Sequence, residues 1–281
     1  MKEHLPLKVI QMDVDQCSSV KKAIKKIIEE EKRIDILINN AGYGLFGALE
    51  DFTVEDIKKQ FETNFFGAIR TIQQVLPIMR SQRSGNIVNI SSISGLIGFP
   101  ASSVYVSSKF ALEGLSESLS YEVEPYGINV ILIEPGVINT NFVENIVLPD
   151  NTQEILSSLL SSPSSALPPS SKTVATDSSV GDLTRNMDKG EGKETTKYLD
   201  IVKRFLSHYY PAMSTAPDPK EVAQVILESI HMQPKHSFSR GHNLFRYPVG
   251  EDAKLYAEAK KKISDSKLHS LVAERTISIE D

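Results

Sequence analysis

Residues 86–95 read "NIVNISSISG", a short run of strand-forming residues followed at once by small ones. The run 86–90 has the β-branched, apolar centre of a buried strand, and the serines and glycine after it are typical of a loop. In open α/β folds, ligands bind at the carboxyl ends of parallel strands. The stretch therefore places the hydroxyls of Ser91 and Ser92 where a ligand would bind, although an ordinary turn would use the same residues.

The flanking segments repeat this alternation of strand and helix. Strand-like runs recur at 7–12, 34–38 and 128–133, and amphipathic helical patterns at 17–30 and 53–79. Apolar strands that alternate with such helices indicate a parallel sheet covered on both faces. Thr53 and Asp56 form an approximate capping box before the second of these helices. A helix at 219–231, a strand at 244–250 and a tail helix at 252–273 complete the predicted α/β fold, a single doubly wound domain over residues 1–281.

The alternation stops after Gly136, and residues 141–217 form a long excursion from the predicted sheet. A stretch of this length in a compact domain is typically a lid over a site or a disordered insertion. We expect disorder over 157–195, which is polar and begins with a Ser/Pro-rich run, and helices over the flanks 141–156 and 197–213. The ordered flanks are predicted to form a substrate lid.

Composition narrows the function classes. The 281 residues carry a net charge of −5 without a block of Lys or Arg, so we do not expect a nucleic-acid partner. No run reaches the roughly 18 apolar residues of a membrane span, and the first residues lack the apolar core of a signal peptide. The single cysteine, Cys17, excludes a disulfide framework and favours a reducing, cytoplasmic location. No cluster of His, Cys and carboxylates predicts a metal site.

Tyr105 and Lys109 lie four positions apart in the helical stretch "SSVYVSSKFAL" (102–112), so their side chains project from one helix face. An ammonium near a phenol lowers the phenol pKa from its usual value near 10, and a phenol tuned in this way can exchange a proton with an alcohol or carbonyl oxygen. An exposed surface pair has the same spacing, and this alternative stays open on the pair alone. Ser92 precedes Tyr105 by thirteen positions and could hydrogen-bond the same oxygen.

Two further segments carry amides near strand ends. In "ILINNAGYG" (36–44) the run Asn40-Ala41-Gly42 follows a buried strand, and its glycine allows close approach of a ligand to the backbone. Asn64 lies inside an apolar helical stretch, where asparagine is unfavourable unless its side chain has a role or the helix kinks. A solvated asparagine in the middle of a helix is the alternative.

These motifs resemble the short-chain dehydrogenases/reductases when they are taken in order. N-N-A-G after one strand, N-F-F-G in the next helix, S-S after the following strand, Y-x-x-x-K, and P-G after the strand 128–133 occur in the sequence of that family. The resemblance covers residues 7–142 without a gap and resumes at the C-terminal helix and "RYPVG". It implies a Rossmann-like fold and an oxidoreductase that uses NAD or NADP, with a slight preference for NADP.

The resemblance also implies residue roles. Tyr105 would be the general acid/base, Lys109 would lower its pKa and bind the nicotinamide ribose, and Ser92 would orient the substrate oxygen. Asn64 would hold a water that links Lys109 to solvent. Besides Tyr105 and Lys109, the implied cofactor-binding residues are Asp13, Val14, Asn40, Ala41, Gly42, Pro135, Gly136, Val137 and Thr140. The reaction would be reversible hydride transfer between the cofactor and an alcohol or carbonyl compound.

The sequence departs from this family at its N-terminal end. It lacks the T-G-x-x-x-G-x-G loop that would hold the cofactor pyrophosphate, and the run 7–12 matches the third strand of the family. We therefore expect an N-terminally truncated sheet without the first two strands and their helices. In the family order 3-2-1-4-5-6-7 this loss leaves 7–12 without its neighbour and 34–38 as an exposed edge strand.

The lid composition favours a hydrophobic substrate, a primary or secondary alcohol with its aldehyde or ketone. Its ordered parts are apolar and aromatic, at Phe142, Val143, Ile146, Val147, Leu148, Phe205, Tyr209 and Tyr210. The lid resembles the branch of the family with 17β-hydroxysteroid and retinol dehydrogenases, although such residues also serve as core. The alternative function is a catalytically inactive remnant that acts as a binding or interaction protein. The resemblance implies a homodimer or homotetramer.

Overall fold

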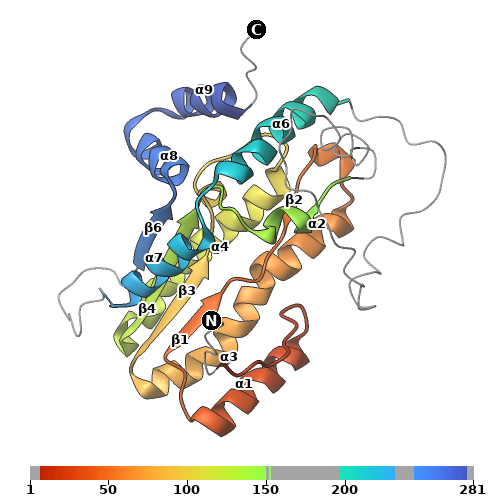
Figure 1. The fold of residues 1–281 in the computed structure, drawn as a ribbon. Helices are drawn as coiled ribbons and strands as arrows, with labels where there is room; N and C mark the ends of the chain where they lie inside the picture. Colours follow the sequence, from red (N-terminus) through yellow and green to blue (C-terminus); the bar gives the residue numbers. More distant parts are fainter. Residues whose placement is uncertain (1–6, 150–151, 153–196, 232–243, 277–281) are drawn as a thin grey trace, which may run out of the picture.

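The computed structural model of this chain describes residues 7–149, 152, 197–231 and 244–276. Within these residues the main sheet has the strand order β1-β3-β4-β6, and every neighbouring pair is parallel (Figure 1). The strands are β1 (Ile36–Asn39), β3 (Gly85–Ile90), β4 (Ile128–Pro135) and β6 (Leu244–Val249). The predicted Rossmann-like parallel sheet is thus confirmed.

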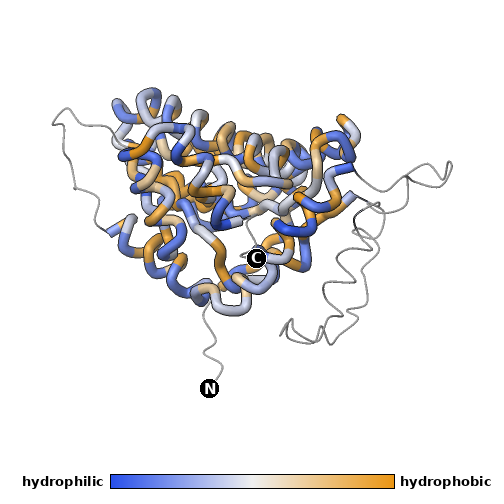
Figure 2. The backbone as a smooth tube through the Cα atoms, turned by 90° about the horizontal axis from the view of Figure 1, so that it is seen from above, coloured by the Kyte–Doolittle hydropathy of each residue, from blue (hydrophilic) through white to orange (hydrophobic). Residues whose placement is uncertain are grey.

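Helices cover both faces of this sheet because its strands are apolar on both sides. On one face α1 (Cys17–Glu31), α3 (Gly67–Gln82) and α4 (Ser103–Val123) pack on Ile87 and Val130. On the other face α7 (Pro219–His231) packs on Val88 and Ile131. Hydrophobic and hydrophilic residues alternate along the helices, as expected where each buries one side (Figure 2).

The predicted helix over 53–79 is interrupted. Thr53 caps α2 (Val54–Phe61) through a capping box with Asp56, as predicted. A π-helical turn (Glu62–Phe66) then separates α2 from α3, and Asn64 lies in that turn. The asparagine therefore marks a local change of helix geometry, a feature often found at functional sites.

The prediction of a strand at 7–12 is wrong. These residues are extended but unpaired, and the side chains of Leu7 and Val9 are 76% and 92% exposed. Without a neighbouring strand the segment has no hydrogen-bond ladder, and Lys8 instead forms ion pairs with Glu30 and Glu31 at the end of α1. The predicted edge strand is present as β1, the outer strand of the described sheet, where Ile36 and Ile38 are 42% and 46% exposed.

The excursion from the sheet is only partly helical. Over 141–149 a 3₁₀ turn (Asn141–Asn145) leads into β5 (Ile146–Val147), which pairs with β2 (Gly44–Leu45), so the predicted helix over 141–156 is wrong there. Thr140 caps this turn by accepting a hydrogen bond from the backbone N–H of Phe142. Helix α6 (Leu199–Thr215) confirms the predicted helix over 197–213. The predicted disordered stretch, 157–195, lies outside the described residues.

The C-terminal segment contains two helices rather than the single predicted one. These are α8 (Glu251–Lys262) and α9 (Asp265–Thr276), separated where Ile263 adopts an extended backbone conformation. Short 3₁₀ turns elsewhere span Leu49–Asp51, Ile93–Gly95 and Glu124–Tyr126. Across the described residues, no helix combines the length and the apolar character needed to cross a bilayer.

Candidate active site

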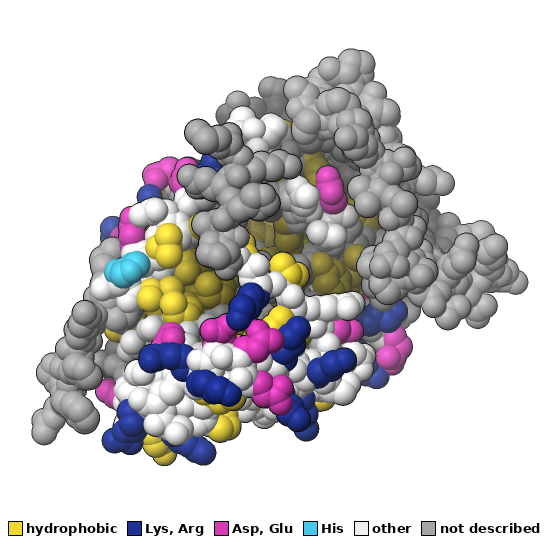
Figure 3. All heavy atoms as spheres, turned by 60° about the horizontal axis from the view of Figure 1, so that its bottom comes forward, with side chains coloured by type: hydrophobic (Ala, Val, Ile, Leu, Met, Phe, Trp, Pro, Cys, Tyr) yellow, Lys and Arg dark blue, Asp and Glu magenta, His cyan; other side chains and the backbone are white. Residues whose placement is uncertain are grey.

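A cavity of about 620 Å³ lies at the carboxyl ends of β1, β3 and β4. Its floor comes from the residues that directly follow these strands, which is the edge where a parallel sheet presents ligand-binding groups. Helices α4, α6, α7 and α8 and the loop before α4 contribute further lining residues. On the molecular face drawn in Figure 3, hydrophobic side chains gather in a hollow beside mixed positive and negative charges.

Tyr105 and Lys109 both line this cavity from α4, and each is only 7% exposed. They are therefore not the exposed surface pair that their spacing also allowed. The Lys109 ammonium donates a hydrogen bond to the carbonyl oxygen of Ile90 at 2.8 Å and lies 5.7 Å from the centroid of the Tyr105 ring. This hydrogen bond holds the Lys109 ammonium at the end of β3, near the face of the phenol ring.

Burial governs the ionisation of this pair. Loss of water around the phenol raises the pKa of Tyr105 to about 12, and the Ser92 hydroxyl offsets part of that rise. Burial lowers the pKa of Lys109 to about 8, while the charge of Glu113 raises it. Burial is thus the largest influence on the Tyr105 pKa, and the lowering of that pKa by Lys109 stays a prediction.

Ser92 is buried at the start of the 3₁₀ turn after β3, and it lines the same cavity. Its hydroxyl accepts a hydrogen bond from the Ser94 backbone N–H at 3.1 Å and donates to the Pro135 carbonyl oxygen at 3.4 Å. The structure therefore brings Ser92 together with Tyr105 and Lys109, on one strand end and one helix.

Asn64 lines a second cavity of about 240 Å³, which shares Asn40, Ile90 and Lys109 with the first. The Asn64 amide is only 3% exposed and is held by the backbone of Tyr43 through hydrogen bonds of 3.0 and 3.1 Å. Its side chain thus fixes the loop after β1, and it reaches Lys109 only across the smaller cavity.

The predicted cofactor-binding residues divide among three places. The larger cavity contains Asn40, Gly42, Pro135, Gly136, Val137 and Thr140, and the smaller one contains Val14, Ala41 and again Asn40. Asp13 lines neither of these cavities, and its carboxylate accepts a hydrogen bond from the Asp15 backbone N–H. The residues that line the cavity beside Tyr105 and Lys109 are those that could hold the nicotinamide and ribose of a dinucleotide.

A family model described as short chain dehydrogenase matches residues 2–151. This chain belongs to the short-chain dehydrogenase family. An uncharacterized oxidoreductase of Schizosaccharomyces pombe is 31% identical over 92% of this chain and 88% of its own length. Human retinol dehydrogenase 8 is 45% identical over 48% of this chain and 43% of its own length. The structure "ElxO with NADP Bound" matches with a TM-score of 0.57 at 25% identity, over 86% of this chain and 76% of the other.

Aromatic rings form one wall of the cavity in this short-chain dehydrogenase. Phe46 makes edge-to-face contacts with Tyr105, Phe205 and Tyr209, with ring centroids 5.7, 5.5 and 5.3 Å apart. Phe142 lies 5.8 Å from the Tyr105 ring. Four further predicted lid residues pack in the same apolar cluster, namely Val143, Ile146, Leu148 and Tyr210. The remaining one, Val147, is 47% exposed.

Several residues of this short-chain dehydrogenase site lie outside the motifs that the sequence shows. Phe46 lies four positions after Gly42, the last residue of the N-N-A-G run, and this nearness to the motif could have drawn attention to it. Asp252 lines the cavity from α8 and accepts a hydrogen bond from the Val137 backbone N–H at 2.8 Å. His208 lines it from α6. No sequence pattern points to Asp252 or His208, because both residues lie far along the chain from the motifs. The described residues contain no group that could hold a metal ion.

Proposed function

We propose that this short-chain dehydrogenase is an NAD(P)-dependent oxidoreductase that interconverts a hydrophobic alcohol and its aldehyde or ketone. The observation that carries the proposal is the convergence of Ser92, Tyr105 and Lys109 on one cavity with a largely aromatic wall. Binding pockets of this kind combine an apolar surface with a few convergent polar groups.

In this proposal each polar side chain has a distinct task. The cofactor supplies or accepts the hydride when it is bound. Ser92 orients the substrate oxygen, and the Tyr105 phenol donates a proton to that oxygen during reduction and removes it during oxidation. Lys109 places a positive charge below the phenol and stabilises any phenolate that forms. Asn64 holds the loop after β1 in place and, with a water, would connect Lys109 to solvent.

The high pKa of Tyr105 keeps the phenol in the form that carbonyl reduction requires. At neutral pH a phenol with a pKa of about 12 is protonated, so it is ready to donate. The Lys109 pKa of about 8 means that the supporting charge is lost as pH rises through that value. We expect the reduction rate to fall above about pH 8, measured as kcat/KM against pH.

Separate findings support the proposed hydrophobic substrate and the proposed cofactor NADP. Retinol dehydrogenase 8 is named for a hydrophobic alcohol, and the aromatic rings Phe46, Phe142, Phe205 and Tyr209 suit such a molecule better than a sugar. NADP is bound in the solved relative named above, which supports NADP over NAD. A cytoplasmic homodimer or homotetramer completes the proposal.

The second candidate is a binding protein without catalytic activity. Cofactor binding separates the two candidates, because the enzyme requires saturable binding of NADPH or NADH and the binding protein does not.

The test uses the purified chain and two measurements. Binding of NADPH and NADH is followed by fluorescence titration, and activity is followed as turnover of a hydrophobic aldehyde. We expect Tyr105→Phe to retain cofactor binding and to lose activity by a factor on the order of 10²–10⁴. Tyr121→Phe is the matched control, because Tyr121 is 54% exposed on the same helix and does not line the cavity. Absence of saturable binding of either nucleotide would reject the enzyme proposal for this chain.

A further inference from the structure

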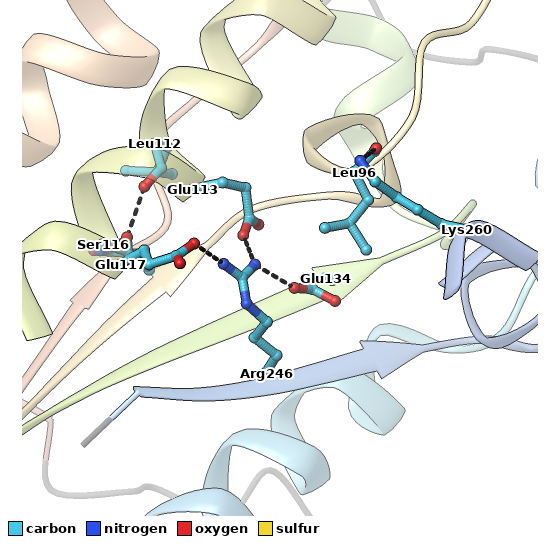
Figure 4. A network of polar contacts seen from close by, with 9 residues as sticks. Leu96, Leu112, Glu113, Ser116, Glu117, Glu134, Arg246 and Lys260 are labelled. Carbon is cyan, nitrogen blue, oxygen red and sulfur yellow. Dashed lines mark hydrogen bonds and ion pairs between the residues drawn. The ribbon is translucent and has the colours of Figure 1, made fainter. Parts of the chain in front are cut away.

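A group of four charged side chains, two of them buried carboxylates, lies on α4, β4 and β6 and does not line the cavity. Arg246, on β6, points between the carboxylates of Glu113, Glu117 and Glu134 (Figure 4). It forms ion pairs with all three, at 3.0 Å to Glu117 and 3.1 Å to Glu134. The side chains of Glu113 and Glu134 are only 7% and 2% exposed, whereas Glu117 is 57% exposed. One arginine thus serves two buried carboxylates.

Glu113 is the member of this group that lies nearest to Lys109 along α4. It follows Lys109 by four positions on α4, so both side chains project from the same helix face. A side chain at Gly95 would collide with Glu113 Cγ at 2.8 Å and Ser91 Oγ at 2.6 Å, so the glycine lets the loop after β3 approach the carboxylate closely. Glu113 Oε1 and Ser91 Oγ are both buried without a hydrogen-bond partner among the described residues.

Lys109 and Glu113 are both buried and carry opposite charges one helical turn apart, so the Glu113 carboxylate favours the charged form of Lys109. The Lys109 ammonium donates its hydrogen bond to a neutral carbonyl oxygen, and burial alone lowers its pKa. The neighbouring Glu113 carboxylate raises that pKa. Burial in turn raises the pKa of Glu113 to about 7, with the charge of Glu134 acting in the same direction and Arg246 opposing it.

We propose that Glu113 is a positioning residue of the active site, which Arg246 anchors from β6 and which keeps the Lys109 ammonium charged below Tyr105. The catalytic meaning of this inference rests on the proposed function, because Lys109 acts on substrate only if the chain is an oxidoreductase. The groups that face Glu113 are Lys109 and Glu117 on α4, Ser91 after β3, Glu134 on β4 and Arg246 on β6, while Lys260 and Lys261 on α8 act on Glu134.

The test measures the pKa of Lys109 directly in the full chain labelled with ¹³Cε-lysine, without cofactor or turnover. The Lys109 signal is assigned by its loss in Lys109→Arg. We expect Glu113→Gln, which keeps the shape of the side chain and removes its charge, to lower the Lys109 pKa by about 1 unit. The matched control is Glu117→Gln, which removes the same charge one turn further along α4 at an exposed position, and we expect a change below about 0.3 unit.

A second measurement uses the unmodified chain and does not depend on the variant folding. The Lys109 ¹³Cε shift should show an additional inflection at the pH at which the Glu113 carboxyl titrates, as two coupled groups do. A Lys109 pKa that is unchanged by Glu113→Gln, or equally lowered by Glu117→Gln, overturns the inference, as does a titration without that inflection. If nucleotide binding is absent while Lys109 responds to Glu113, the proposed function fails and the positioning role of Glu113 stands.

Discussion

At Tyr105 and Glu113, the loss of water around an ionisable side chain is only partly offset by hydrogen bonds. Ser92 lowers the pKa of the buried phenol, and Arg246 lowers that of the buried carboxyl, yet both values stay well above the usual ones. Perturbed groups of this kind gather at functional sites, because a group that exchanges protons has to change charge without being freely solvated.

The ionisation of Glu113 predicts a pH dependence of stability. Its folded-state pKa is raised from 4.5 to about 7, so its contribution is fully present below pH 4.5 and is lost as pH rises through about 7. We expect the free energy of unfolding to fall by up to about 3 kcal/mol over this interval through this group. Urea denaturation of wild type and Glu113→Gln at several pH values measures the difference. Parallel pH profiles for the two proteins would contradict the prediction.

The sequence was informative for residues whose partners lie on neighbouring motifs. Ser92, Tyr105 and Lys109 meet as predicted, because a strand end and the helix that follows it are placed by local connection. Glu113 was missed because a glutamate on a helix, with Arg246 absent from its surroundings in the sequence, resembles a solvated residue. The partner is 133 positions away, and only the pairing of β4 with β6 brings it close.

At the scale of elements, an aromatic side chain directly after β2 contacts both helix α6 and helix α4. Phe46 is 3% exposed and contacts a ring of α4 and two rings of α6. Edge-to-face pairs of this kind stabilise a protein by about 0.5–1.5 kcal/mol each beyond the burial of their area.

Removal of this ring should therefore loosen the lid. We expect Phe46→Ala to reduce the free energy of unfolding by about 3–5 kcal/mol and to increase hydrogen exchange in α6 before it does so in the sheet. Phe66→Ala is the control, because Phe66 is 44% exposed, and its cost should stay below about 1 kcal/mol. Equal losses in the two variants, or unchanged exchange in α6, would show that Phe46 does not hold the lid.

Elements with strong local signals were predicted, and those that depend on distant partners were not. The cap of α2 and the helix α7 could be predicted because their signals lie within their own sequences. The predicted helix over 141–156 failed over 141–149 because Ile146 and Val147 pair with β2, about a hundred positions earlier in the chain. The tail was predicted as one helix because nothing in its composition marks the extended Ile263.

At the scale of the whole molecule, the described sheet ends on one side at β1. Ile36 and Ile38 expose apolar side chains on this outer strand, and its backbone groups on that side have no strand partner among the described residues. An exposed apolar edge is a template for pairing with another chain. The sequence comparison with the family predicted this edge, but it also predicted a strand at 7–12, which has no ladder to join.

The edge predicts self-association of the purified chain. We expect Ile36→Lys to weaken association by about tenfold, equivalent to ~1.4 kcal/mol, because a charge on an edge strand opposes strand pairing. Sedimentation velocity over a range of concentrations measures the effect. Val54→Lys adds the same charge at a 65% exposed position on α2, away from the sheet. An equal effect of both variants would attribute any change to net charge rather than to the edge.

The ion-pair group at Arg246 also has a consequence for the order in which the chain is made. Glu113 leaves the ribosome 133 residues before Arg246, a delay on the order of ten seconds at usual rates of synthesis. Until β6 emerges, Glu113 and Glu134 have no arginine to pair with, and burying them would be costly. The nascent chain should therefore resist protease only after β6 is complete, which ribosome-bound chains stalled before and after that strand would show.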